Sequence, residues 1–129
     1  MKLANQCVIF VIDDEVNHLN LLQMRLLALN FKVEVAANGL LALQKMRADP
    51  TAIDLIVTDI MMPGLDGIGL LQTLRNDPKL KDIPLIAMTG FPEKNLIDQS
   101  LKYGVSDILL KPFPFDELLN RVKSHLSIG

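Results

Sequence analysis

Short apolar runs that end in polar or charged residues recur along the chain and predict its strands. They cover residues 8–12, 31–36, 54–58, 85–88 and 107–110. Most are almost continuously apolar or β-branched, which is typical of strands buried on both faces of a parallel sheet. The segment 31–36 differs, because Val33 and Val35 alternate with charged residues. That alternation favours a shorter, more exposed strand at the edge of the sheet.

Apolar residues at helical spacing fill the intervals between these strands and predict five helices. In the second helix, Leu40, Leu43 and Met46 are expected to face the core. The fourth is expected to begin with Pro92 at its first position and to stop at Gly104. The apolar face of the first helix is expected to contain Leu19, Leu22, Leu26 and Leu29. The five helices are predicted over about 17–29, 40–48, 68–75, 92–103 and 114–126.

The resulting order, a strand followed by a helix five times over, indicates an α/β fold with a parallel sheet and right-handed crossovers. Five strands are too few to close a barrel. The sequence therefore predicts an open, doubly wound, flavodoxin-like sheet with helices on both faces and strand order 2-1-3-4-5. This order places the most apolar strands in the middle and the segment 31–36 at an edge. We expect residues 1–129 to be one domain with a core over about 7–126 and no output domain.

Composition narrows the functional classes. The chain has 129 residues, of which 50% are hydrophobic and 22% charged, so it should fold as one globular domain. The net charge of −2 and the lack of a long basic run argue against direct binding of nucleic acid. The short apolar run near the N-terminus ends in two acids, which fits neither a signal peptide nor a membrane span. The single cysteine, Cys7, excludes an internal disulfide, and we expect a cytoplasmic location.

Polar residues end four of the predicted strands and form the candidate site. Asp13 and Asp14 follow the first strand, Asp59 the third, Thr89 the fourth and Lys111 the fifth. In an open parallel sheet, ligands bind at the carboxyl ends of the strands where the winding direction changes. With the predicted order, that point lies between the first and third strands. We therefore expect the other four side chains to converge on Asp59.

Neighbouring strands of a sheet lie about 4.8 Å apart. Three carboxylates at the ends of two such strands would therefore repel one another strongly. A hard divalent cation relieves that repulsion, and Mg²⁺ prefers oxygen ligands. Thr89 would add a hydroxyl donor and Lys111 a mobile positive charge. An anionic group bound at Asp59 would thus meet a metal ion, a hydroxyl and an ammonium.

These residues resemble the receiver domain of two-component response regulators. The resemblance covers about residues 8–126 and rests on Asp13-Asp14, on the run from Asp59 to Gly67 (DIMMPGLDG), on Thr89, and on Lys111-Pro112-Phe113. It implies that Asp59 accepts a phosphoryl group from a sensor histidine kinase or a histidine phosphotransfer protein in a phosphorelay. The chain would then catalyse its own phosphorylation and a slow dephosphorylation, rather than act as a conventional turnover enzyme.

The resemblance also implies roles for the other site residues. Asp14, Asp59 and the backbone carbonyl of Met61 would hold Mg²⁺, which Mn²⁺ could replace, with Asp13 acting through water. Thr89 and Lys111 would bind the phosphoryl oxygens. Phosphorylation would then change a surface for a downstream protein, formed by the fourth helix, the fifth strand and the fifth helix. The bond between Lys111 and Pro112 is expected to be cis.

Two features depart from the usual receiver pattern. Ile108 stands three residues before the lysine, where receivers commonly carry Tyr or Phe, so the usual movement of an aromatic ring with Thr89 is not expected. Met61 and Phe91 stand two residues after the phosphoacceptor and the threonine, at positions that flank the approach of water in the family. Neither side chain can orient a water molecule, which predicts slow loss of the phosphoryl group.

Three alternatives remain. A Mg²⁺-dependent phosphatase with an aspartyl nucleophile would typically have Asp-x-Asp after the first strand, whereas this chain has Asp13-Asp14-Glu15. A flavodoxin-like cofactor binder would need a phosphate cradle after Ile12, where acids stand instead. An interaction module of receiver shape that is never phosphorylated would not require all five site residues.

Overall fold

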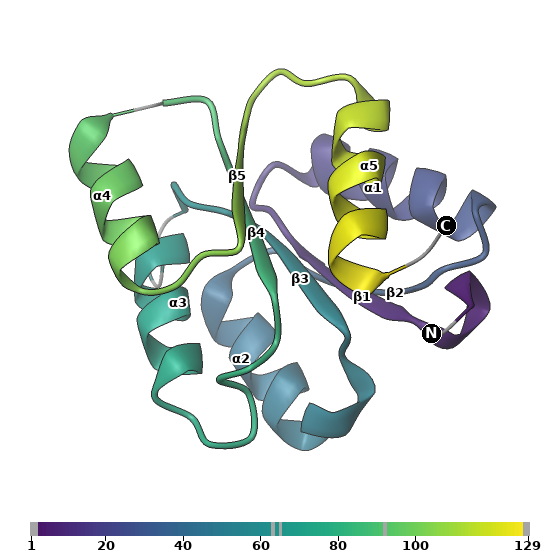
Figure 1. The fold of residues 1–129 in the computed structure, drawn as a ribbon, viewed down its shortest axis with the longest axis horizontal. Helices are drawn as coiled ribbons and strands as arrows, with labels where there is room; N and C mark the ends of the chain where they lie inside the picture. Colours follow the sequence, from purple (N-terminus) through teal and green to yellow (C-terminus); the bar gives the residue numbers. More distant parts are fainter. Residues whose placement is uncertain (1–2, 63, 65, 92, 128–129) are drawn as a thin grey trace.

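A computed structural model describes residues 3–62, 64, 66–91 and 93–127 of the chain. Its five strands form one parallel sheet in the order β2-β1-β3-β4-β5, which confirms the predicted topology (Figure 1). They are β1 (Val8–Ile12), β2 (Lys32–Ala36), β3 (Leu55–Asp59), β4 (Leu85–Thr89) and β5 (Asp107–Leu110). The five α-helices are α1 (Val16–Ala28), α2 (Gly39–Ala48), α3 (Gly67–Arg75), α4 (Lys94–Lys102) and α5 (Phe115–Leu126). Two short 3₁₀ helices, η1 (Ala4–Gln6) and η2 (Pro50–Ala52), precede β1 and β3.

The sheet separates two hydrophobic cores, because successive side chains of each strand point to opposite faces. Ile9 and Val11 of β1 face one core together with buried residues of α1 and α5. Phe10 and Ile12 face the other core, which α2 and α3 cover. Figure 1 shows α1 and α5 on one side of the sheet and the remaining helices on the other. All residues of β3 and β4 are buried, and their apolar residues confirm the prediction of strands buried on both faces.

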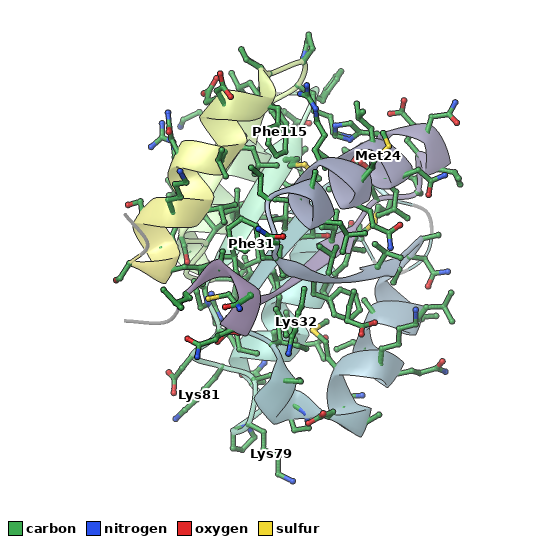
Figure 2. All side chains as sticks on the ribbon, turned by 90° about the vertical axis from the view of Figure 1, so that its right-hand side faces the viewer. Met24, Phe31, Lys32, Lys79, Lys81 and Phe115 are labelled. Atoms are coloured by element: carbon green, nitrogen blue, oxygen red, sulfur yellow. The ribbon has the colours of Figure 1, made fainter. Side chains whose placement is uncertain are left out.

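The edge strand β2 is the most exposed of the predicted apolar segments. Lys32 and Glu34 are exposed, whereas Val33 and Val35 are partly buried and pack against the α1 side. Figure 2 views the molecule from the side on which Lys32 and Met24 lie. The alternation of charged and apolar residues in the sequence thus indicated both the position of this strand and the face that it buries.

Two helix predictions need correction. Leu40 was expected to face the core, but it is 60% exposed. The buried side of α2 runs through Gly39, Ala42, Leu43 and Met46, and Leu40 lies about 100° around the helix from Gly39. Leu29 is also exposed, because α1 ends at Ala28 and Leu29 is its C-cap. The fourth helix begins at Lys94, and the expected start at Pro92 lies outside the described residues.

Arg75, at the end of α3, connects three segments of backbone. Its Nη1 donates to the carbonyl oxygens of Lys81 (2.8 Å) and Ile83 (2.9 Å), and its Nη2 donates to that of Gly104 (2.9 Å). Gly104 follows α4 and has a φ of 78°, a conformation that favours glycine. Arg75 therefore ties the C-terminal end of α4 to the loop between α3 and β4.

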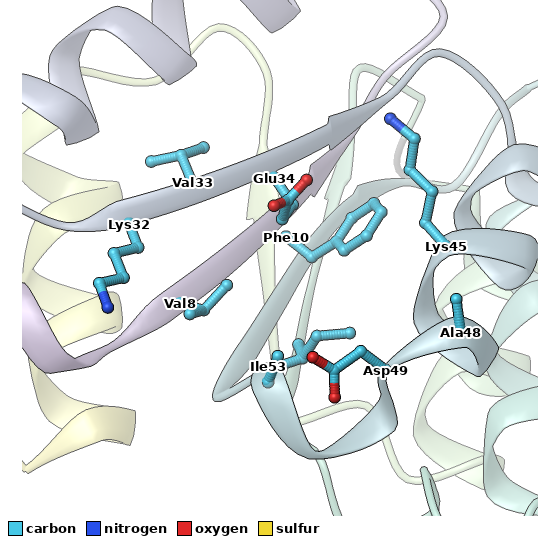
Figure 3. A pocket seen from close by; sticks show the side chains of 10 residues that line it. Val8, Phe10, Lys32, Val33, Glu34, Lys45, Ala48, Asp49 and Ile53 are labelled. Carbon is cyan, nitrogen blue, oxygen red and sulfur yellow. The ribbon is translucent and has the colours of Figure 1, made fainter.

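A recess of about 570 Å³ opens near the starts of β1 and β2 (Figure 3). Its floor is apolar and includes Phe10 and Ile53. Positively charged lysines and negatively charged acidic residues also line it. Lys45 crosses toward β2 and donates to the carbonyl oxygen of Val35 at 2.8 Å. This recess lies toward the opposite ends of the strands from Asp13 and Asp59, so it is separate from the candidate site.

Candidate functional site

Three carboxylates meet where β1 and β3 end. Asp13 follows β1 and is fully buried, Asp14 beside it is exposed, and Asp59 is the last residue of β3 with only 7% of its surface exposed. One oxygen from each carboxylate lies within 4.8 Å of the others. β1 and β3 are hydrogen-bonded neighbours, which explains why residues 46 positions apart come together. The predicted convergence of the acids is confirmed.

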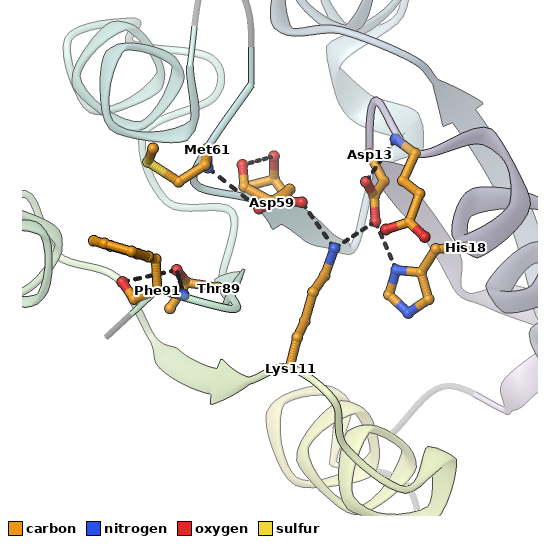
Figure 4. A network of polar contacts seen from close by, with 9 residues as sticks. Asp13, His18, Asp59, Met61, Thr89, Phe91 and Lys111 are labelled. Atoms are coloured by element: carbon orange, nitrogen blue, oxygen red, sulfur yellow. Dashed lines mark hydrogen bonds and ion pairs between the residues drawn. The ribbon is translucent and has the colours of Figure 1, made fainter. Parts of the chain in front are cut away.

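Lys111 directly follows β5, and its side chain reaches the acids across the end of β4, which lies between β5 and β3. Its Nζ donates to Asp59 Oδ2 at 2.8 Å and to Asp13 Oδ2 at 3.0 Å (Figure 4). Its backbone N–H donates to the carbonyl oxygen of Thr89, also at 2.8 Å, which fixes the end of β5 against β4. The Lys111–Pro112 bond is cis, as predicted.

The two buried acids have opposite pKa shifts. Burial raises the pKa of Asp59, repulsion from Asp13 adds to that, and the hydrogen bonds from Lys111 and Met61 only partly offset it. Burial acts in the same direction on Asp13, but hydrogen bonds from His18, the Glu15 backbone and Lys111 outweigh it and lower the pKa. Burial disfavours the charged form of Lys111, yet its bonds to Asp59 and Asp13 raise its pKa. Lys111 therefore stays protonated between the two carboxylates.

The loop after Asp59 folds closely against the end of β3. The Met61 N–H donates to Asp59 Oδ1 at 3.2 Å, and the Gly67 N–H donates to the carbonyl oxygen of Ile60 at 2.8 Å. A Cβ atom at position 67 would lie 2.5 Å from the carbonyl oxygen of Asp59 and 2.6 Å from Cα of Ile60. Only glycine allows this approach. Asp66 then caps α3 by accepting the Gly69 N–H at 2.8 Å.

Thr89 lies at the end of β4 and is fully buried. Its Oγ1 accepts the Phe91 N–H at 3.0 Å and donates to the carbonyl oxygen of Phe91 at 3.2 Å. The hydroxyl is thus bound to its own loop in this state, and the hydrogen bonds of Figure 4 do not join it to the acids.

The residues expected to influence rate and switching lie around this loop. The side chains of Met61 and Phe91 are 53% and 61% exposed, and Figure 4 shows both on the Thr89 side of Asp59. Ile108 pairs with Ala87 in register and is partly buried against the core on the α2 and α3 side. Ile108 therefore packs as a local strand residue in this state.

One residue of the site was missed by the sequence analysis. His18, in the first turn of α1, places its Nδ1 2.6 Å from Asp13 Oδ2. Its ring meets that of Phe113 edge-on, with 5.9 Å between the centroids and 68° between the planes. A histidine in the first helical turn after Asp13-Asp14 was the available signal, because the start of that helix lies beside the end of β1.

Comparison with known proteins identifies the family. The profile of the response regulator receiver domain matches residues 9–123. The chain belongs to the response regulator receiver family. It is 38% identical to the probable transcriptional regulator ycf27 of Cyanidium caldarium over 120 residues, which are 92% of this chain and 45% of that protein. It is 36% identical to hybrid signal transduction histidine kinase D of Dictyostelium discoideum over 94% of this chain and 8% of that protein.

Solved structures agree with this assignment. The receiver domain of the Francisella response regulator 1452 has a TM-score of 0.84 and 31% identity, with 94% of this chain and 97% of that chain covered. A putative response regulator from Chloroflexus aurantiacus has a TM-score of 0.85 and 29% identity, with 94% and 98% covered. The chain spans less than half the length of the curated relatives with which it was compared.

The receiver domain therefore carries an acidic site suited to phosphoaspartate signalling. Carboxylate oxygens from Asp13, Asp14 and Asp59 fit the oxygen preference of a divalent cation, and receiver domains typically use Mg²⁺. Membership of this family also implies a histidine kinase as a partner. Among the helices of the described segments, none is both long enough and apolar enough to cross a bilayer.

Proposed function

We propose that Asp59 accepts a phosphoryl group from a phosphohistidine of a sensor kinase or phosphotransfer protein, and that residues 7–126 act as one receiver unit. The observation that supports this most directly is the contact of Lys111 Nζ with Asp59 Oδ2, 2.8 Å away, beside two further acids. A carboxylate that must attack a phosphorus atom needs nearby positive charge, because the transferring group is itself anionic.

In the proposed step, an oxygen of the Asp59 carboxylate forms a bond to phosphorus while the bond from phosphorus to the histidine nitrogen breaks. The leaving imidazole takes up a proton, and Asp59 becomes an acyl phosphate. Mg²⁺ held by Asp14, Asp59 and the Met61 carbonyl, with Asp13 acting through water, would neutralise negative charge on the transferring group. Mn²⁺ could take its place.

Lys111 and Thr89 would bind the oxygens of the transferred group. Lys111 can do so with the third donor of its ammonium, because its contacts to Asp59 and Asp13 use two. Thr89 can do so by turning its hydroxyl away from the carbonyl oxygen of Phe91, a neutral hydrogen bond of 3.2 Å. Loss of that bond would release the loop that precedes α4.

The downstream partner would bind a surface formed by α4, β5 and α5. This surface continues from the Thr89 loop and exposes Leu101 and Leu110, which are 61% and 51% accessible. Exposed apolar side chains next to a segment that changes on phosphorylation suit recognition by a protein whose binding depends on that change.

The test is intact mass spectrometry after incubation with acetyl phosphate and Mg²⁺. The unmodified chain should gain one phosphoryl mass, Asp59→Asn should gain none, and the exposed-acid control Asp116→Asn should behave like the unmodified chain. Equal phosphorylation of Asp59→Asn would show that the acceptor is another residue. A parallel assay for phosphate release from a generic phosphomonoester should stay at background, because a true phosphatase would turn over.

A further inference from the structure

His18 lies in the site but takes no part in the proposed transfer of the phosphoryl group. Its Nδ1 lies 2.6 Å from Asp13 Oδ2, and Lys111 Nζ lies 3.0 Å from the same oxygen (Figure 4). A carboxylate oxygen can only accept, so Nδ1 must carry the hydrogen of this bond. Asp13 Oδ2 therefore receives two donors, one from α1 and one from the end of β5.

The remaining contacts hold both partners in place. Asp13 Oδ1 accepts the backbone N–H of Glu15 at 3.0 Å, and the side chain of Asp13 has no exposed surface. The His18 ring is 20% exposed and packs edge-on against Phe113, two residues after Lys111. His18 thus links α1 to the loop that carries the lysine.

Phosphorylation changes the demand on Lys111. The ammonium now uses two of its three donors on Asp59 and Asp13, and a phosphoryl group attached to Asp59 would compete with Asp13 for it. A buried carboxylate that loses its only charged partner is strongly destabilised. Asp13 would face that loss if the phosphoryl group drew the ammonium away from it and the lysine were its only side-chain donor.

We propose that His18 is a positioning residue for phosphoryl acceptance, which keeps Asp13 hydrogen-bonded and in place while Lys111 moves onto the phosphoryl group. This inference rests on the proposed function of Asp59. His18 contacts neither Asp59 nor the transferred group. It acts through Asp13 by lowering the cost of moving the lysine.

Two substitutions of nearly equal shape separate this role from simple packing. In His18→Asn, the amide nitrogen is bonded to Cγ, as Nδ1 is in the histidine. It can therefore donate a hydrogen bond to Asp13 from nearly the same position. His18→Leu has the same branching as His18→Asn but no donor, and both variants lose the ring contact with Phe113. We expect His18→Leu to slow phosphorylation by acetyl phosphate roughly tenfold, the effect of losing one hydrogen bond to a charged group. His18→Asn should remain within about threefold of the unmodified chain, a difference too small for a lost charged hydrogen bond.

A spectroscopic readout tests the contact without phosphorylation. The ¹³Cγ resonance of Asp13 should be displaced in metal-free His18→Leu and should return toward its original position in His18→Asn. Circular dichroism would establish that both variants fold. If the Leu and Asn variants give equal rates and equal Asp13 resonances, His18 has no positioning role.

The outcomes also distinguish this inference from the proposed function. If the unmodified chain gains no phosphoryl mass, the assignment of Asp59 fails and the role of His18 falls with it, even if the Asp13 resonance responds as expected. If the unmodified chain is phosphorylated and His18→Leu reacts equally fast, only the role of His18 is overturned.

Discussion

The ammonium of Lys111 lies 2.8 Å from the carboxylate of Asp59, so the protein already holds a cation against its proposed phosphoacceptor. The same ammonium lies 3.0 Å from Asp13. This charge stabilises the acids, but it also opposes the approach of a second cation to them. The two roles of the lysine can be separated by measurement.

We expect Lys111→Met to bind Mn²⁺ more tightly than the unmodified chain while accepting a phosphoryl group more slowly. Removing a unit charge about 4 Å away contributes about 1 kcal/mol when water screens it, or roughly fivefold in affinity. Electron paramagnetic resonance of free Mn²⁺ would measure the affinity, and intact mass would follow phosphorylation. Lys79→Met, which changes an exposed lysine, serves as the control. Weaker Mn²⁺ binding by Lys111→Met would contradict the expected competition.

The opposite pKa shifts of Asp59 and Asp13 predict opposite effects on stability. The pKa of Asp59 is higher in the folded protein than its ordinary value of 3.8. The free energy of unfolding therefore falls as the pH rises from 3.8 through the folded pKa, because the folded state resists ionisation of this carboxyl. Asp59→Asn should therefore increase the free energy of unfolding at pH 7, and the gain should disappear below pH 3.8.

For Asp13, whose pKa is lowered, ionisation contributes stability above 3.8 that is lost as the pH falls through the folded pKa. Asp13→Asn should thus decrease the free energy of unfolding at pH 7, with the difference fading in acid. Urea unfolding of both variants at pH 7 and pH 3 tests the pair. Shifts of the same sign at pH 7 would be incompatible with this explanation.

Gly67→Ala should destabilise the protein and slow phosphorylation, because the added Cβ would overlap the backbone of Asp59 and Ile60. We expect a loss of about 1–3 kcal/mol, typical of forced overpacking. Gly90→Ala is the matched control, since its Cβ would meet only Cβ of Lys111 at an ordinary 3.8 Å. Urea unfolding would measure both, and equal stability of the two variants would show that the loop after β3 can relax.

Binding of beryllofluoride should alter the loop after β4 more than the strand that carries Ile108. Thr89 must exchange its bonds to Phe91 for the bound group, whereas Ile108 is an aliphatic residue packed within the sheet. Amide shifts in ¹H–¹⁵N spectra should therefore be largest at Thr89, Gly90, Phe91 and the start of α4. Shifts concentrated at Ile108, with the loop unchanged, would refute this prediction.

The phosphorylated state should be long-lived. Met61 and Phe91 stand on the Thr89 side of Asp59, and neither can accept a strong hydrogen bond from an attacking water. Restoring polar groups with Met61→Asn and Phe91→Glu should speed phosphate release roughly 5–30-fold, the effect of about 1–2 kcal/mol. A double variant that loses phosphate no faster than the unmodified chain would show that these side chains do not shield the group.

The sequence predicted the sheet because the apolar runs are short, continuous and separated by helical intervals. It predicted the acid cluster because the carboxyl ends of neighbouring parallel strands must meet at one edge. Thr89 and Lys111 were placed at the site by the same argument, whereas the cis bond before Pro112 came from resemblance to a family, since no periodicity in the chain encodes it.

Other features depend on geometry that residue spacing does not specify. Leu40 was misplaced because the buried face of α2 includes the small residues Gly39 and Ala42. A search for large apolar residues at helical spacing does not detect such small residues. His18 was missed because its role depends on the angle at which α1 leaves β1. The opposite pKa shifts of Asp13 and Asp59 likewise reflect unequal numbers of donors around two similar acids.

The three backbone contacts of Arg75 have a mechanical consequence for α4. The contact to Gly104 ties the C-terminal end of this helix to the α3–β4 loop, where the other two contacts lie. At the other end, Glu93 provides no side-chain cap, and Ser100 is the only buried residue of α4 among those described. A helix held at one end and with few buried residues would be expected to tilt about the held end if its other end were displaced. The nine residues of α4 span about 13 Å, so a small shift beside Thr89 would become a change in the tilt of a whole surface. Arg75 would then be the fixed point about which the angle of α4 changes.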